Sequence, residues 1–190
     1  RAVVLTGSGG SFCSGADLRS TRVPLPRPEG APDVASGDVG RGIIRYAQRL
    51  IAAVMDCEKP VIAAVDGVAA GMGAHLAFAC DLVVASDRAR FIEVFIRRAL
   101  VPDAGGAYLL SRMVGPHKAK ELMFFGDDVS AAEAERIGLV NRVVPAAELD
   151  ATAMQWAARL AGGPTRTLAL TKQLVNRALD VDRATAFEAE

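Results

Sequence analysis

The chain has 190 residues, the length of one ordinary domain, and 51% of its residues are hydrophobic while 23% are charged. This composition excludes intrinsic disorder and allows one substantial core. Its 22 basic and 22 acidic residues leave a formal net charge of +0, so the chain lacks the basic excess that nucleic-acid-binding proteins normally carry.

The first half of the chain alternates apolar runs with glycine-rich turns. Residues 2–6 predict a buried strand that begins without an initiator Met, so we expect part of a longer protein to precede it. The proline-rich stretch 19–41 is typical of a long mobile surface loop. Beyond it, one helical face collects apolar residues before Lys59-Pro60 ends the helix: Ile43, Ile44, Ala47, Leu50, Ile51 and Val54. Further strands are predicted at 61–65, 82–86 and 89–93, and a helix at 71–80.

The second half is mainly helical. Helices are predicted at 102–114 and 116–125, and Ser130-Ala-Ala-Glu133 is a capping box that starts a helix ended by Gly138. Residues 139–144 predict a strand, and 146–161 and 164–179 predict two last helices. Strands that alternate with helices indicate an α/β fold. We expect an α/β core over 1–145 and, in the same domain, a C-terminal helical region over 146–190.

Several kinds of site are absent from the sequence. The three cysteines, Cys13, Cys57 and Cys80, form no Cys-x-x-Cys pair, which favours a reducing compartment, and we expect a cytoplasmic protein. His75 and His117 have no metal-ligand spacing, so no metal is expected. The longest apolar runs are far shorter than the roughly 20 residues of a membrane helix, so no membrane association is expected.

Two glycine-bearing junctions remain as candidates for chemistry, and each follows a predicted strand. One is the Phe12-Cys-Ser-Gly-Ala-Asp-Leu18 segment, and the other runs from Gly67 to His75. Small residues at two such junctions allow two backbone N–H groups to approach one point and stabilise a developing oxyanion. The alternative is that both are ordinary tight turns.

These segments, in this order, resemble the crotonase (enoyl-CoA hydratase/isomerase) superfamily. The similarity continues through Lys59-Pro-Val-Ile-Ala-Ala-Val-Asp-Gly67, Ala70-Gly-Met-Gly73, Cys80-Asp-Leu82, Val101-Pro-Asp-Ala-Gly-Gly106 and Ala134-Glu-Arg-Ile-Gly-Leu-Val140. The resemblance implies a spiral of ββα units whose N-terminal unit lies outside this chain. It also implies an acyl-CoA substrate, no cofactor apart from the CoA of that substrate, and a homotrimer or a dimer of trimers.

By this resemblance, the backbone N–H groups of Ala16 and Met72 form the oxyanion hole for the thioester. The residues expected to bind substrate are Ala16, Asp17, Leu18, Arg19, Gly71, Met72 and Phe95. Arg19, and less clearly Arg22 and Arg27, are candidates to pair with the phosphates of CoA. For Arg22 and Arg27, a role as plain solvated loop residues is at least as well supported.

The catalytic acids depart from the hydratase pattern. The two glutamates of the hydratases fall on His75 and Phe95, whereas Asp103 matches the acid of related isomerases. A single carboxylate that removes and returns one proton suits double-bond isomerisation. Asp103 is also a candidate helix N-cap, and the two roles are compatible. His75 is either a second proton carrier or a polar lining residue. Glu93 is a spare carboxylate whose direction the sequence does not decide.

Isomerisation of an enoyl-CoA in fatty-acid or related acid catabolism is therefore the leading hypothesis. Hydration of a 2-enoyl-CoA and a non-catalytic acyl-CoA-binding subunit are the alternatives. A serine hydrolase is less favoured, because Ser8, Ser11 and Ser14 have no evident histidine partner.

Overall fold

The fold is built on two small sheets. The computed structural model describes residues 1–17, 29–30, 40 and 42–190. Within them, a four-stranded parallel sheet has the order β1-β2-β4-β7, formed by Val3–Thr6, Val61–Val65, Leu82–Ser86 and Arg142–Val144. A three-stranded sheet has the order β3-β5-β6, formed by Val68–Ala70, Arg90–Ile92 and Asp128–Ser130. In it, β3 and β5 are parallel, and β5 and β6 are antiparallel.

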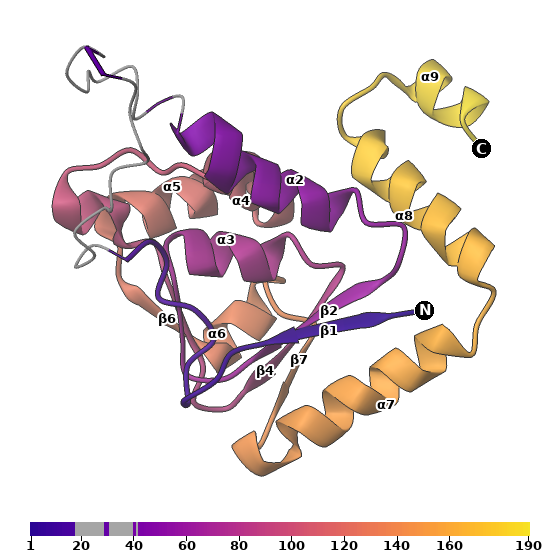
Figure 1. Cartoon of the computed structure of the whole chain (residues 1–190), viewed down its shortest axis with the longest axis horizontal. Helices are drawn as coiled ribbons and strands as arrows, with labels where there is room; N and C mark the ends of the chain where they lie inside the picture. Colours follow the sequence, from indigo (N-terminus) through magenta and orange to yellow (C-terminus); the bar gives the residue numbers. More distant parts are fainter. Residues whose placement is uncertain (18–28, 31–39, 41) are drawn as a thin grey trace.

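Helices cover both faces of the four-stranded sheet. Figure 1 shows α2, α3, α4 and α5 on one side of it and α7 on the other. The helical elements are η1 (Ile43–Gln48), α2 (Arg49–Met55), α3 (Met72–Phe78), η2 (Val94–Arg98), α4 (Gly106–Met113), α5 (Gly115–Phe125), α6 (Ala131–Arg136), η3 (Ala146–Glu148), α7 (Leu149–Ala161), α8 (Thr165–Ala178) and α9 (Arg183–Glu188). No helix in the described part of the chain is long and apolar enough to cross a membrane.

Strand β2 contributes side chains to the core on both faces of the four-stranded sheet. All five of its residues are buried, and successive side chains enter opposite layers of the core. Val61, Ala63 and Val65 belong to the cluster under α2, α3 and α4, whereas Ile62 and Ala64 pack with Leu149 and other α7 residues. A strand covered on both faces is continuously apolar rather than alternating, which is how its sequence reads.

Most of the long elements agree with the sequence predictions, but the strand expected over 139–144 covers only Arg142–Val144. The strands at 61–65 and 82–86 are confirmed residue for residue, and Ser130 caps α6 by accepting the Glu133 N–H at 3.2 Å. The short elements β3, β6 and α9 have no counterpart among the predictions. The prediction that one apolar face covers the 43–54 helix is wrong at Ile44 and Leu50, because these side chains are 62% and 43% exposed. The loop expected over 19–41 falls outside the described residues at all but three positions, so it stays a prediction.

Helix α8 is joined to the body mainly through polar side chains. The ammonium of Lys172 donates to the Val54 carbonyl at 3.0 Å and to Asp81 Oδ2 at 2.9 Å. The same Asp81 oxygen accepts the Val61 N–H at 2.7 Å, which ties α8 to the first residue of β2. Asn176 adds a bond from Nδ2 to the Met55 carbonyl at 3.0 Å. Lys172 thus bonds the C-terminal end of α2 and, through Asp81, the start of β2.

A second contact holds the far end of α8. The hydroxyl of Tyr108 donates to Asp180 Oδ2 at 2.7 Å, and Arg112 donates to Asp180 Oδ1 at 2.6 Å. These two donors, the tyrosine hydroxyl first and the guanidinium second, lower the pKa of Asp180 below its usual value. The C-terminal end of α8 is therefore attached to α4 by a charged group on the surface.

Replacing the ammonium of Lys172 should loosen α8. We expect Lys172→Met to lower the free energy of unfolding by about 1–3 kcal/mol, because two part-buried acceptors lose their donor. Urea denaturation followed by circular dichroism measures the change. Lys118→Met is the matched control, since Lys118 pairs with the exposed Glu121, and such a pair contributes less than about 1 kcal/mol. Equal losses in both variants would contradict a special role for Lys172.

Candidate active site

The two glycine-bearing junctions of the sequence lie against each other. The N–H groups of Phe12 and Cys13 both donate to the Val68 carbonyl at 3.0 Å, and the Ala70 N–H donates to the Cys13 carbonyl at 2.9 Å. Cys13 thereby forms an isolated parallel bridge with Ala69. The chain after β1 is in this way paired to β3, immediately before α3 begins.

Two glycines permit this approach. A Cβ on Gly15, which has φ of +90°, would lie 2.8 Å from the Ala70 carbonyl oxygen and 3.6 Å from the Met72 nitrogen. A Cβ on Gly73 would lie 2.1 Å from the Cys13 carbonyl oxygen. Real side chains do not tolerate such distances, so only glycine fits at these points. Residue 15 therefore lies directly beside the start of α3.

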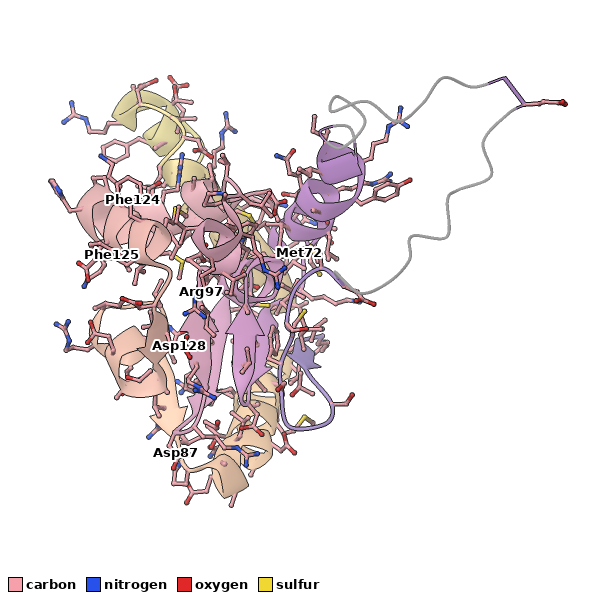
Figure 2. All side chains as sticks on the ribbon, turned by 90° about the vertical axis from the view of Figure 1, so that its left-hand side faces the viewer. Met72, Asp87, Arg97, Phe124, Phe125 and Asp128 are labelled. Atoms are coloured by element: carbon pink, nitrogen blue, oxygen red, sulfur yellow. The ribbon has the colours of Figure 1, made fainter. Side chains whose placement is uncertain are left out.

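The junctions bring two unpaired backbone donors to one region. Met72 is the first residue of α3, where a helix leaves its N–H groups without an intrahelical acceptor. Neither the Met72 N–H nor the Ala16 N–H has an acceptor among the described residues. Ala16 is exposed, and Met72, which Figure 2 labels, is half-buried, so both residues border the surface. An anionic oxygen placed here would meet two donors and the positive end of a helix.

A buried pair of ionisable side chains lies one turn into α3. His75 is 0% exposed, and its Nε2 lies 3.0 Å and 3.1 Å from the two carboxylate oxygens of Glu93, which is 5% exposed. The imidazole also stacks on Phe95, with ring centroids 5.4 Å apart and planes at 10°. His75 and Phe95, the two residues that the resemblance aligns with the hydratase glutamates, are thus in contact with each other in the core.

The turn that carries Asp103 closes over this imidazole. The Gly106 N–H donates to the Asp103 carbonyl at 3.0 Å, and between them Ala104 and Gly105 adopt φ of 48° and 78°. A Cβ on Gly106 would lie 2.2 Å from Cε1 and 2.3 Å from Nε2 of His75. Glycine at 106 is therefore required for the turn to rest on the ring.

Asp103 is half-buried, and its carboxylate makes no hydrogen bond with any described residue. Burial raises the pKa of this carboxyl, and the charge of His75 opposes that rise. The N-cap of α4 is Gly105, without a side-chain cap, so the expectation that Asp103 caps this helix is wrong. Helix α4 begins at Gly106, four residues after the predicted start at 102, because the positive φ at Ala104 and Gly105 comes first.

The other predicted site residues have different places. Gly71 precedes α3 with φ of 53° and is buried, and Phe95 is 9% exposed, while Asp17 is exposed. Leu18, Arg19, Arg22 and Arg27 lie outside the described residues. His117 is exposed on α5. Among the described residues, no three His, Cys, Asp or Glu side chains come together in a way that could hold a metal ion.

Glu93 is the site residue whose role the sequence reasoning missed. The sequence shows Glu93 as a nearby carboxylate but does not show its contact with His75. The available signal was its position between Ile92 and Val94 in an otherwise apolar run. A single acidic residue in such a run enters the core only when it has a partner.

Comparison with known proteins places this geometry in context. The family model described as enoyl-CoA hydratase/isomerase matches residues 1–190. The 1,2-epoxyphenylacetyl-CoA isomerase of Escherichia coli K12 is 40% identical over 178 residues, which cover 94% of this chain and 65% of that protein. The short-chain-enoyl-CoA hydratase of Clostridium acetobutylicum is 40% identical over 192 residues, which cover 100% of this chain and 69% of that protein. The chain thus spans about two thirds of the length of these relatives.

Solved structures share the fold. The enoyl-CoA hydratase/isomerase of Cupriavidus metallidurans CH34 superposes with a TM-score of 0.87 at 41% identity, covering 100% of this chain and 68% of that one. The enoyl-CoA hydratase of Bacillus anthracis gives a TM-score of 0.88 at 32% identity, with 100% and 69% covered.

The packing of Gly106 against the imidazole can be tested by adding one methyl group. We expect Gly106→Ala to lower the free energy of unfolding by about 1–3 kcal/mol, because Glu93 and Phe95 hold the ring that would have to move. Thermal and urea denaturation measure the loss. Gly42→Ala is the control, since a Cβ there meets nothing within 4 Å and the residue has helical φ and ψ. That variant should be unchanged or gain about 0.5–1 kcal/mol. A Gly106→Ala protein as stable as wild type would contradict the described contact.

Proposed function

Because the chain belongs to the enoyl-CoA hydratase/isomerase family, we propose that it binds an enoyl-CoA thioester and moves its double bond, with Asp103 as the proton carrier. The observation that carries this proposal is the set of carboxylates around the site. The positions of the hydratase glutamates hold His75 and Phe95, and Glu93 is buried against His75. Among the described residues, Asp103 is the partly accessible carboxylate on the turn that rests on the His75 ring.

The proposed reaction is a balanced proton transfer. The Asp103 carboxylate removes a proton from C2 of a 3-enoyl-CoA, and the electron pair of that C–H bond delocalises into the thioester oxygen and the adjacent double bond. The N–H groups of Ala16 and Met72 stabilise the resulting enolate oxygen. Asp103 then returns the same proton to C4, which leaves the 2-enoyl-CoA. No atom is gained or lost, so no co-reactant is needed.

The environment of Asp103 suits this role. Its pKa is raised by burial, and a base with a raised pKa holds an abstracted proton better than an ordinary aspartate. The absence of a hydrogen bond from any described residue leaves the carboxylate oxygens available to the substrate. The substrate-binding roles proposed for Asp17 and Gly71 rest on their places beside the two donors. The roles proposed for Leu18 and Arg19 rest on the sequence alone.

Hydration is the second candidate, and it is supported by relatives named as hydratases. Adding water needs one group to activate the water and another to protonate the carbon. Asp103 would have to perform both steps here, because His75 has no exposed surface. Supplying 2-enoyl-CoA and 3-enoyl-CoA separately distinguishes the two: isomerisation consumes the 3-enoyl substrate, and hydration the 2-enoyl substrate. A cytoplasmic location and a trimeric assembly stay predictions.

Removing the base should abolish turnover without unfolding the chain. We expect Asp103→Asn to lower turnover of 3-enoyl-CoA by at least about 10²-fold, with melting temperature and acyl-CoA binding nearly unchanged. Asp87→Asn is the control, because Asp87 is exposed at the end of the sheet away from Met72 (Figure 2). Turnover of Asp103→Asn at the wild-type rate would rule out the proposed mechanism.

The oxyanion hole can be tested at a position where proline is structurally acceptable. Met72 is the first residue of α3, where proline fits and only the free N–H is lost. We expect Met72→Pro to lower the turnover rate by about 10²–10³-fold, the typical effect of losing one such donor. Met72→Leu keeps the N–H and should have a mild effect. If a folded Met72→Pro protein retained full activity, Met72 would not be an oxyanion donor.

A further inference from the structure

Glu93 is a carboxylate in the core, and His75 is its one hydrogen-bonding partner among the described residues. It lies between β5 and η2, is 5% exposed, and both of its oxygens are directed at His75 Nε2. Removing an ionised carboxylate from water is costly unless an opposite charge accompanies it. His75 is the only group with which the Glu93 side chain forms an ion pair within the described part of the chain. Within the described residues, the two side chains therefore depend on each other for a polar partner in the core.

The Glu93 carboxylate also fixes the orientation of the His75 imidazole ring. With both Glu93 oxygens facing Nε2, that nitrogen must carry the hydrogen. The other nitrogen, Nδ1, is buried and has no hydrogen-bond partner in the described residues. The orientation of the imidazole thus depends on Glu93 and on the stacked Phe95 ring rather than on Nδ1.

We propose that Glu93 and His75 act as a positioning pair, in which Glu93 fixes the imidazole and the imidazole both supports the 103–106 turn and provides positive charge beside the Asp103 carboxylate. Two contacts carry the inference: the ring is held by Glu93, and Gly106 rests on that ring. The inference rests on the proposed function, in which Asp103 carries the proton. His75 is not itself a catalytic residue here, because it has no exposed atom for a substrate to touch.

In the described part of the chain, charged groups on three neighbouring elements bear on the environment of Asp103. From α3, His75 is the charged group that acts on it, and it lowers the pKa that burial raises. From the β5–η2 junction, Glu93 acts through His75. On α4, Tyr108 and Arg112 are bound to Asp180 instead. Replacing the charged pair by a neutral one therefore removes the cation next to Asp103, and its titration midpoint should move to higher pH.

The main test is the double variant His75→Gln with Glu93→Gln. Two amides of similar reach can hydrogen-bond to each other, so no unpaired charge is left in the core. The chain is labelled with ¹³C at the aspartate carboxyl groups, and the Asp103 signal is identified by its absence in Asp103→Asn. The titration midpoint of that signal is followed by NMR, which requires no turnover. We expect a higher midpoint in the double variant, while Glu121→Gln on the outside of α5 leaves it unchanged.

The single variant His75→Gln supplies a check on stability. It leaves Glu93 buried without a cation, so it should be less stable to urea than the double variant although it contains fewer substitutions. In an active protein, the acidic limb of the pH–rate profile should move to higher pH together with the NMR midpoint. An unchanged midpoint in the double variant would overturn the positioning role, and so would a single variant that is the more stable of the two.

The experiment separates this inference from the proposed function. If Asp103→Asn turns over enoyl-CoA normally but the Asp103 midpoint moves in the double variant, the pair does control Asp103 and the assigned reaction is wrong. If Asp103 is needed for turnover but its midpoint does not move, the reaction stands and the pair only fills the core. A merely structural pair would alter stability and leave both the midpoint and the acidic limb in place.

Discussion

The close backbone pairing between residues 12–15 and the β3–α3 junction is the constraint on which the site depends. Two carbonyl oxygens, those of Val68 and Cys13, hold the segment after β1 against β3. Glycines at 15 and 73 allow a separation that any side chain would prevent. Once the pairing forms, the exposed N–H of Ala16 and the first N–H of α3 border one region without any side chain having to place them. A site made of backbone groups tolerates substitution of most neighbouring side chains, but not of the two glycines.

Mutual compensation of two buried ionisable side chains is the second constraint, and it explains how the core accepts Glu93 beside His75. A histidine at 75 without Glu93 would leave a buried ring with no partner for either nitrogen. Glu93 without His75 would be a buried anion. When the two are paired, the His75 ring can stack on Phe95 and lie against the backbone of Gly106. The result is a site in which the less buried carboxylate, that of Asp103, belongs to the turn that rests on the His75 ring.

The sequence predicts elements that are long or buried on both faces, and it misses those defined by their neighbours. The run 61–65 is apolar throughout because two layers cover it. By contrast, β3 and β6 have three residues each, too few to show a period, and exist through pairing with β5. Ile44 fits an apolar helical stripe, but no described element covers it. The two candidate oxyanion donors could be proposed from glycine patterns and resemblance. The Glu93–His75 contact could not, because it joins residues 18 positions apart through a packing arrangement that no spacing encodes.

The way α8 is attached has a consequence for the order in which the molecule opens. Ala169 is the only buried residue of α8, and Val175 is 65% exposed. Separation of α8 from the body would therefore expose little additional apolar surface to water. Segments of this kind detach in sub-global fluctuations that require less free energy than unfolding the sheets. The amide hydrogens of α8 would then exchange with solvent through this partial opening, while those of β2 and β4 exchange only when the whole core unfolds. The chain would thus contain two cooperative units, with Lys172 at the boundary between them.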